Sequence, residues 1–529
     1  MIKRKLPAAC AAATLLLATC VAATLSVSAI AADKKPNILF ILSDNQHAGL
    51  LGIYGNPDIK TPHIDRLAAG GVKFTNAFAV NGMCSPTRAT LMTGLMPSQH
   101  GLHDWLNDEQ MSEWPRDWSA VAEFRSVPYT LKLNGYKTAL IGKWHLGQPW
   151  EASLGFDHWM TFTSGHTLNF WKNTVIENGE VSDIEGRHMV DYFGDKAVEY
   201  IKNHKEDDKP FFALVSFDGP YMDPPTNMGP AKNRHYAYYE KQVLSSFPSE
   251  PVNKNYITQL VDFAKKNEDK EFLNRIIKLA IGNMAGDHAT RANMASQNTL
   301  VDDNVGRLLD TLKETGLDEN TIVIYSSDQG TYYGQHGLWT HTVLSQPSTL
   351  QETAFHIPLI VRQPGKKQGK VVEELIGQYD IAATILDLAG INQQLPGSPG
   401  KSFAYMLTAE KVGQLHDAIF YEQTETRAIR TKQYAYWKRM DSEFGPNELY
   451  DMVKDPYQRE NLAEKEEYKK VIVELDKRLT EFYAAYTDPK YDLWNGGTAK
   501  GTISHPKKFK KRFGDQWELK TEILPAFAE

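Results

Sequence analysis

Near its beginning the chain carries the stretch Pro36-Asn37-Ile38-Leu39-Phe40-Ile41-Leu42-Ser43-Asp44, a short apolar run that ends in polar residues. Such a run is typical of a strand buried on both faces of a sheet. Four later stretches have the same character: residues 138–142, 211–217, 321–326 and 357–361. Helical periodicity separates them, most clearly at residues 299–312. This alternation predicts an α/β fold, with a large, mostly parallel mixed sheet sandwiched by helices.

The character of the chain changes after Gly400. Two short strands, a turn and a charged helix follow, at residues 418–422, 434–439, 455–456 and 464–486. We therefore expect a catalytic domain at 32–405 and a smaller C-terminal α+β subdomain, with a small antiparallel sheet and a helix, at 406–529. A polar, helix-forming stretch at about 228–294 is interpreted as an insertion on the core sheet.

The first segment has the pattern of a signal peptide. Lys3, Arg4 and Lys5 precede a long apolar run, and Ala29-Ile30-Ala31 then offers the small residues of a cleavage site. We expect residues 1–31 to be removed and the protein to be periplasmic or secreted; a retained membrane anchor is the alternative. Because no later run is comparably apolar, stable membrane association is not expected.

Composition indicates which partners the protein can bind and how many cysteines the mature protein would contain. The 529-residue chain has a formal net charge of −7, which argues against nucleic-acid binding and requires a local basic pocket for any anionic substrate. The three cysteines are Cys10, Cys20 and Cys84, and the first two lie in the predicted signal peptide. Cys84 would therefore have no partner for an intramolecular disulfide. Its ordinary interpretation is a small buried apolar residue.

Two pairs of polar residues follow predicted strands. Asp44-Asn45 follows the first strand, and Asp328-Gln329 follows the strand at 321–326. Ligands bind beyond the carboxyl ends of strands in α/β sheets. Each pair offers a carboxylate and an amide oxygen, a donor set that favours Ca²⁺, with Mg²⁺ possible, over zinc. A single aspartate at such a place is more often a turn or cap residue, but the arrangement occurs twice.

Cys84-Ser85-Pro86-Thr87-Arg88 predicts the start of a helix. Ser85 can cap it, Pro86 suits its first turn, and Gly94 can end it. Cys84 would then lie at a helix N-terminus, where free N–H groups favour an anion, with Arg88 about one turn away. The alternative is a capped surface helix with an unreactive thiol.

These residues resemble the sulfatase family of the alkaline phosphatase superfamily. Residues 84–88 match its C-x-P-x-R signature, in which the cysteine becomes formylglycine (3-oxoalanine). Other segments agree with the family's motifs in order along the chain: Asn37 to Gln46, Gly135 to Gly147, Ser327 to Gly330, Glu448 to Asp451, Asp455-Pro456 and Asn461-Leu462. The resemblance covers nearly all of the chain after the signal peptide.

The resemblance implies an alkaline phosphatase-like fold and a specific chemistry. The aldehyde at position 84 would hydrate to a diol; one hydroxyl attacks sulfur and the second allows sulfate to leave. The cation would be bound by position 84 and by Asp44, Asn45, Asp328 and Gln329. Arg88 and Lys143 would hold the diol and sulfate oxygens, and His145 would act as a base.

Two departures from the family's pattern concern the leaving-group acid. Many sulfatases have Pro-His where this chain has Pro220-Tyr221, and many have a lysine where it has His341. We expect His341 to contact sulfate and to protonate the departing oxygen, because histidine has a suitable pKa. Tyr221 would be a supporting donor.

Aromatic residues suggest the substrate class. His103, Trp105 and Trp339 are candidate substrate-binding residues because aromatic faces suit sugar rings, although such residues are more often anchors of the core. We expect a sulfated poly- or oligosaccharide as substrate, and a formylglycine-generating (sulfatase-maturating) enzyme as partner. The alternatives are a phosphodiesterase, phosphatase or phosphonate hydrolase of the same superfamily, and a catalytically idle carbohydrate-binding relative.

Overall fold

The computed structural model describes residues 34–107, 114–167, 169–222, 232–251, 286–339, 341–342, 348–366, 368–503 and 506–518. The chain divides into two units, residues 1–35 and 36–529. The fold described below is the fold of the second unit. The predicted signal peptide at 1–31 lies outside the described residues, as does most of the predicted insertion at 228–294.

A ten-stranded mixed sheet forms the centre of the second unit. Its strands are β1 (Asn37–Ser43), β2 (Val72–Phe78), β3 (Lys137–Gly142), β4 (His158–Phe162), β5 (Lys172–Glu177), β6 (Glu180–Glu185), β7 (Phe211–Ser216), β8 (Thr321–Ser327), β9 (His356–Arg362) and β10 (Lys370–Gly377). Their order across the sheet is β10-β2-β9-β8-β1-β7-β3-β4-β5-β6. The predicted fold class and all five predicted strands of this sheet are confirmed.

The middle of the sheet is parallel. Strand β1 pairs in parallel with β7 and β8, and β7 pairs in parallel with β3. The register sets Ser43 opposite Ser327, and Ser216 opposite Gly142. Consequently β8, β1, β7 and β3 end together at one edge of the sheet. Antiparallel pairing is found farther out, where β9 meets β8 and β2 and where β5 meets β4 and β6.

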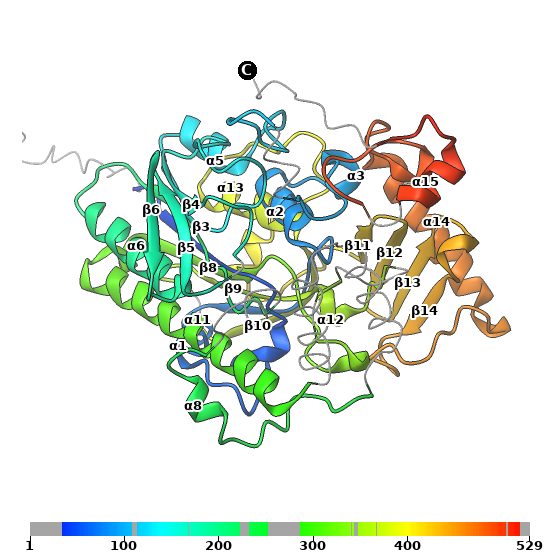
Figure 1. Ribbon diagram of the computed structural model, residues 1–529, viewed down its shortest axis with the longest axis horizontal. Coiled ribbons are helices and arrows are strands. Elements are labelled where there is room, and N and C mark those ends of the chain that lie inside the picture. Colours follow the sequence, from blue (N-terminus) through cyan, green and yellow to red (C-terminus); the bar gives the residue numbers. More distant parts are fainter. Residues whose placement is uncertain are drawn as a thin grey trace, which may run out of the picture. The chain divides into compact units, whose positions relative to one another are not determined.

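Helices cover both faces of this sheet (Figure 1). Alternate residues of β1 divide between two cores: Phe40 packs into one with helices α2, α5 and α13, and Leu39 into the other with α1, α6 and α11. In the whole described part of the chain, the α-helices are α1 (Pro62–Ala69), α2 (Cys84–Thr93), α3 (Pro97–His100), α5 (Val127–Leu133), α6 (Met189–Asn203), α8 (Tyr236–Tyr239), α11 (His288–Glu314), α12 (Glu352–Phe355), α13 (Tyr379–Leu388), α14 (Lys469–Ala485) and α15 (Pro506–Phe513). Each large apolar side chain buried in this way stabilises the fold by roughly 1.5–3 kcal/mol.

A second, antiparallel sheet lies in the C-terminal part of the chain. It consists, in order, of β11 (Ala418–Gln423), β12 (Thr426–Thr431), β13 (Tyr434–Arg439) and β14 (Glu448–Asp451). Helix α14 packs on it through Leu475, Leu479 and Tyr483. This is the small sheet and helix that the sequence predicts, whereas the domain boundary at residue 405 stays a prediction.

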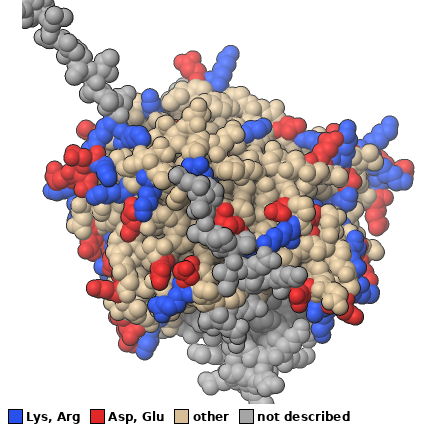
Figure 2. Space-filling model, turned by 90° about the horizontal axis from the view of Figure 1, so that it is seen from above, with Lys and Arg blue, Asp and Glu red and all other residues tan. Residues whose placement is uncertain are grey.

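Charged residues of both signs are interspersed on the described part of the face shown in Figure 2. Among the described residues, no helix is long and apolar enough to cross a membrane.

Candidate active site

Four neighbouring parallel strands bring polar residues from distant parts of the chain to one edge of the large sheet. Asp328 follows β8, Asp44 follows β1, and Lys143 follows β3, while Ser216 is the last residue of β7. All four side chains are buried. The strand-end positions predicted from the sequence therefore lie side by side, because adjacent parallel strands share their carboxyl edge.

Helix α2 supplies two more groups. It begins at Cys84 and ends at Thr93, and it is followed by the cap residue Gly94, whose φ of 71° is the left-handed conformation that glycine adopts readily. The prediction that Ser85 caps this helix is wrong: Met83 occupies the cap position without a side-chain hydrogen bond. The Ser85 hydroxyl instead accepts a hydrogen bond from the Leu106 N–H (3.0 Å) and so fixes the next loop. The first turn of α2 therefore presents Cys84 to the sheet edge.

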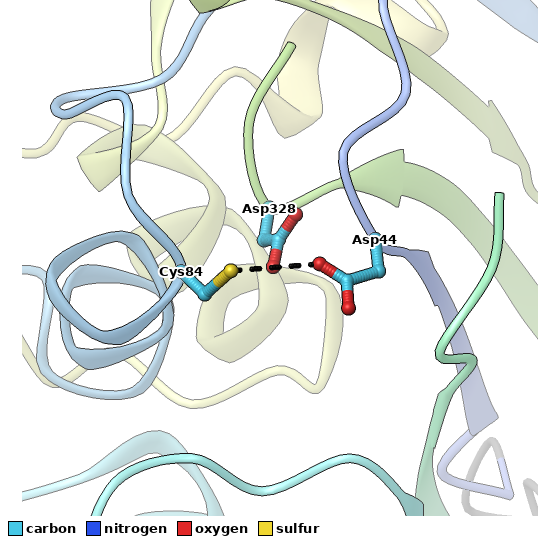
Figure 3. Close-up of side chains that lie close together, drawn as sticks. All are labelled: Asp44, Cys84 and Asp328. Atoms are coloured by element: carbon cyan, nitrogen blue, oxygen red, sulfur yellow. Dashed lines mark hydrogen bonds between the residues drawn. The ribbon is translucent and has the colours of Figure 1, made fainter. Parts of the chain in front are cut away.

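The side chains of Asp44, Cys84 and Asp328 point toward one another (Figure 3). One ligand atom of each lies within 4.8 Å of the others. The Cys84 Sγ lies 3.6 Å from Asp44 Oδ1 and 3.8 Å from Asn45 Oδ1. This cluster, called the acidic centre below, joins three segments separated by 40 and 244 positions in the chain.

Two cations neutralise the acidic centre. The Lys143 ammonium donates to Asp44 Oδ2 (2.6 Å) and to the Cys84 sulfur (3.4 Å). The Arg88 guanidinium donates through Nε to Asp328 Oδ2 (3.0 Å) and through a terminal nitrogen to the Ser216 hydroxyl (2.7 Å). Arg88 and Lys143 thus each hold one of the two carboxylates, as the charge balance of a buried site requires.

The pKa values at the acidic centre follow from burial and from these charges. Burial alone would raise the pKa of Asp44, but Lys143 and Arg88 outweigh it, so the pKa is lowered. Burial, together with the charge of Asp44, raises the pKa of Asp328 to about 6. Burial raises the pKa of the Cys84 thiol to about 12, against the opposing charge of Lys143. The unmodified cysteine is therefore a neutral thiol at pH 7 and a poor nucleophile.

Two amide side chains complete the acidic centre. Asn45 adopts a φ of 58°, and its N–H donates to Asp328 Oδ1 (3.0 Å). The Gln329 amide nitrogen contacts the Asn45 side-chain oxygen and lies 3.2 Å from the Cys84 sulfur, while its oxygen accepts from the Thr87 hydroxyl (3.2 Å). Left-handed backbone at a non-glycine residue is uncommon and clusters at functional sites.

The donor set fits a hard divalent cation. Two buried carboxylates and the Asn45 oxygen converge, and the charge of Asp44 adds to burial in raising the pKa of Asp328. A dication would offset these negative charges, and oxygen ligands of this type suit Ca²⁺ or Mg²⁺. Gln329 presents its nitrogen to the acidic centre, so its use as an oxygen ligand requires rotation of the amide, which exchanges the two atoms.

His145 lies two residues beyond Lys143 in the chain. Its φ is 57°, and its Nε2 lies 3.0 Å from the Leu106 carbonyl oxygen. A carbonyl can only accept, so Nε2 carries the proton and, in the neutral ring, Nδ1 carries the lone pair. The imidazole therefore has the tautomer that a base acting through Nδ1 needs.

His341 and Tyr221 lie side by side over Lys143. Their rings are stacked, with centroids 5.9 Å apart and planes at 17°, and the Lys143 ammonium lies 4.8 Å from the Tyr221 ring centroid. Burial lowers the pKa of His341 to about 4, although the charge of Asp44 acts in the opposite direction. The structure thus brings both residues to the candidate active site, with His341 uncharged at neutral pH.

The three candidate substrate-binding residues have different surroundings. Trp105 packs edge-on against His166 (6.2 Å), whose ring lies 5.5 Å from that of His145. His103 is buried and bonds to the Tyr491 carbonyl (2.8 Å). Trp339 stacks on Phe247 in a buried apolar cluster. Contacts of the described residues place Trp105 near the site and do not bring His103 or Trp339 to the acidic centre.

Two residues of the site were not singled out in the sequence. Ser216 ends β7 and binds Arg88, and Asp218 is a fully buried carboxylate just beyond it. The signal was available, because both lie at the end of the predicted strand 211–217, where the rule that selected Asp44 and Asp328 applies equally.

The fold and the site together define an α/β protein with a candidate metal centre at the carboxyl ends of parallel strands. The model of the family described as "Sulfatase" matches residues 36–391, and that described as "N-sulphoglucosamine sulphohydrolase, C-terminal" matches residues 334–485. The chain belongs to the sulfatase family and is a sulfuric ester hydrolase.

Relatives of similar length support this assignment. The chain is 30% identical to an ulvan-active sulfatase of Formosa agariphila, over 89% of each chain. It is 28% identical to an N-acetylglucosamine-6-O-sulfatase of Bacteroides thetaiotaomicron, over 86% of this chain and 87% of the relative.

Solved structures show the same fold. A protein in complex with its substrate D-glucosamine-2-N,6-O-disulfate superposes with a TM-score of 0.67 at 24% identity, over 87% of this chain and 99% of that one. A phosphonate monoester hydrolase of Agrobacterium radiobacter superposes with a TM-score of 0.60 at 23% identity, over 86% of this chain and 96% of that one. At these identities the likeness concerns the fold alone.

Proposed function

We propose that this protein is an exported sulfatase that removes sulfate from a sulfated carbohydrate, with Cys84 converted to formylglycine and a Ca²⁺ ion bound beside it. The observation that carries the proposal is the position of Cys84, at the first turn of α2 and 3.6 Å from Asp44, within a group that also contains Asp328 and two buried cations.

The chain's own residues would bind the ion and the sulfate. Asp44, Asn45, Asp328 and, after rotation of its amide, Gln329 would hold the cation, which supplies positive charge for the sulfate oxygens. Formylglycine would supply an oxygen nucleophile that the neutral thiol of Cys84 cannot provide. Lys143 contacts both Asp44 and position 84 and is therefore placed to bind a sulfate oxygen. Arg88 is anchored by Asp328 and Ser216 and would orient the carboxylate while adding positive charge.

Proton transfer would be divided between two histidines. His145, with the proton on Nε2, would accept a proton at Nδ1 from the group at position 84. His341 would protonate the departing oxygen. It is neutral in the described state, but a bound sulfate ester would raise its pKa because an adjacent anion stabilises the imidazolium. Tyr221, stacked on His341, would support it.

The substrate class rests on the relatives and on the site. The names of two relatives refer to ulvan and to N-acetylglucosamine 6-O-sulfate, which are carbohydrates. Trp105, with His166, offers an aromatic group beside His145 that would suit a sugar ring. The implied partners are the sulfated carbohydrate and a formylglycine-generating enzyme.

Mass spectrometry of one peptide tests the modification. Trypsin releases residues Phe74 to Arg88, and conversion of the thiol to the aldehyde lowers the peptide mass by roughly 18 Da. We expect this loss after co-expression with a formylglycine-generating enzyme, together with hydrolysis of 4-nitrophenyl sulfate and of sulfated sugars such as N-acetylglucosamine 6-sulfate. Without modification, or with Cys84→Ala, activity should fall to background.

The same preparation separates the proposal from its alternatives. Faster hydrolysis of 4-nitrophenyl phosphate or a phosphonate ester than of the sulfate would favour a phosphate or phosphonate hydrolase. An unmodified Cys84 in protein purified from its native source, with no hydrolysis of any ester, would favour an idle carbohydrate-binding relative.

A further inference from the structure

Asp218 lies inside the candidate active site but has no part in the roles described above. It follows β7, and in the sheet β7 lies between β1 and β3, whose ends carry Asp44 and Lys143. The backbone is tied to both neighbours: the Asp44 N–H donates to the Gly219 carbonyl (3.0 Å), and the Lys143 N–H donates to the Ser216 carbonyl (2.8 Å). Asp218 is therefore held between the two residues that meet at position 84.

The carboxyl group of Asp218 is buried without a partner. The residue is 0% exposed, and neither side-chain oxygen forms a hydrogen bond with another residue in the part of the chain that the structure describes. Other buried carboxylates differ: Asp302 accepts from the backbone N–H groups of His63 and Ile64, and Glu425 from the backbone and hydroxyl of Ser348. Because a buried polar group without a partner destabilises the fold, such a group is expected to find its partner in the functional state.

The charges around Asp218 are those of the active site. Burial, and the charge of Asp44, raise its pKa to about 8; its own backbone N–H, Lys143 and Arg88 act in the opposite direction. In either protonation state the carboxyl group keeps an oxygen that can accept a hydrogen bond. The role inferred below therefore does not depend on titration.

We infer that Asp218 is a substrate-binding residue, whose carboxyl group accepts a hydrogen bond from a donor on the sugar that carries the sulfate. The inference rests on the proposed function. A sulfate ester has only acceptor oxygens, so an accepting carboxyl oxygen cannot be satisfied by the sulfate itself. The rest of the substrate can supply the donor, because a sugar carries hydroxyl and amide N–H groups.

This contact would select the substrate. A substrate without a donor at this place leaves Asp218 unpaired in the closed site, and a site with an unpaired buried polar group discriminates strongly against such a ligand. Aryl sulfates, whose ring lacks the donor, should therefore benefit from Asp218 much less than sulfated sugars do.

The test compares two substrates in four proteins. The proteins are the mature native enzyme, Asp218→Leu, Asp218→Asn and the control Asp302→Asn, which alters a buried carboxylate of α11 that accepts hydrogen bonds from the first turn of α1. The measured quantity is the ratio of kcat/KM for N-acetylglucosamine 6-sulfate, or the best substrate of a sulfated-sugar panel, to kcat/KM for 4-nitrophenyl sulfate. We expect this ratio to fall by about tenfold or more in Asp218→Leu, because a hydrogen bond to a polar buried group is lost. It should fall less in Asp218→Asn, which keeps an accepting oxygen, and stay the same in Asp302→Asn.

The outcomes separate this inference from the proposed function. If the native enzyme hydrolyses the sugar sulfate and the ratio is unchanged in both Asp218 variants, the inference is wrong and the proposed function stands. If both Asp218 variants lose Ca²⁺ binding, measured by calorimetry, Asp218 is a metal ligand and the inference is also wrong. A native enzyme that hydrolyses no sulfated sugar overturns both. Should Asp218→Leu fail to fold, the ratio in Asp218→Asn decides, with a threefold fall supporting the inference and no fall opposing it.

Discussion

A thiol in the surroundings of Cys84 has little chemistry of its own. Its pKa of about 12 keeps it protonated. Lys143 and the amide of Gln329 donate to the sulfur, and the thiol itself faces the acceptor oxygens of Asp44 and Asn45. Donors and a pair of carboxylates that can hold a cation are better matched to an oxygen at position 84 than to a neutral sulfur. The groups around Cys84 therefore favour the proposed conversion of this residue to formylglycine.

The leaving-group role of His341 is open to a direct test. His341→Ala should reduce kcat/KM by roughly 10²–10⁴ for a sugar sulfate, whose alcohol leaves poorly, because a general acid contributes that much. The loss on 4-nitrophenyl sulfate should be far smaller, since nitrophenolate leaves without a proton. Steady-state kinetics on both substrates measures the difference, and Tyr221→Phe, which keeps the stacked ring, is the control with a smaller effect. Equal losses on the two substrates would show that His341 is not the acid.

The candidate active site lies at the ends of neighbouring strands. Gly142, the last residue of β3, shows how closely the ends of β3 and β7 approach each other. Its φ is 119°, and a Cβ there would overlap the carbonyl oxygen of Ser216 on β7. That carbonyl accepts the hydrogen bond from the Lys143 N–H (2.8 Å). The position of Lys143 therefore depends on two strands approaching without a side chain between them.

Replacing Gly142 should disturb the site as well as the fold. Gly142→Ala should lower the free energy of unfolding by more than the roughly 1–2 kcal/mol expected for left-handed backbone alone, and should reduce kcat/KM at least tenfold because Lys143 is displaced. Gly135→Ala is the matched control: its φ is also positive, at 88°, but nothing lies within 4 Å of the added Cβ. The free energy of unfolding of Gly135→Ala should fall by only the roughly 1–2 kcal/mol expected for left-handed backbone, and its kcat/KM should not change. Urea unfolding and steady-state kinetics measure both effects, and identical behaviour of the two variants would contradict the argument.

On the scale of the whole molecule, the acidic centre links the parts of the fold. It joins β1, β8 and α2, and through Ser216 and Lys143 also β7 and β3, so its charge balance bears on the stability of the entire sheet edge. An ion bound there binds the folded state and not the unfolded chain, and therefore stabilises the fold by mass action.

Removal of the ion should lower the melting temperature. At a Ca²⁺ concentration of about 100 times Kd, the stabilisation amounts to about 2.7 kcal/mol, which EGTA should abolish and added Ca²⁺ restore. Thermal unfolding followed by circular dichroism measures this, with Mg²⁺ in place of Ca²⁺ to compare the two ions. The variant Asp328→Asn lacks one of the two carboxylate charges that would bind the ion, so its melting temperature should change little when Ca²⁺ or EGTA is added. A melting temperature that is the same with and without Ca²⁺ in the native protein would argue against a bound ion.

The local sequence pattern alone predicts the central strands, the polar residues at their ends and the helix that begins at Cys84. The apolar runs of β1, β3, β7, β8 and β9 predict their strands because a strand buried on both faces must be continuously apolar. The polar residues at strand ends predict that Asp44 and Asp328 lie close together, because parallel strands share a carboxyl edge. The segment from Cys84 to Gly94 predicts the helix that carries Cys84.

Other features were decided only by the tertiary structure. Strand order sets which strand ends are neighbours, and this order placed β7, with Ser216 and Asp218, between β1 and β3. The fold gives His103 the Tyr491 carbonyl and Trp339 the ring of Phe247 as neighbours, and it gives Ser85 the Leu106 N–H as its partner in place of a capping role. Residue type and spacing reflect local constraints, whereas partner and exposure depend on contacts between segments up to hundreds of residues apart, which a single sequence does not specify.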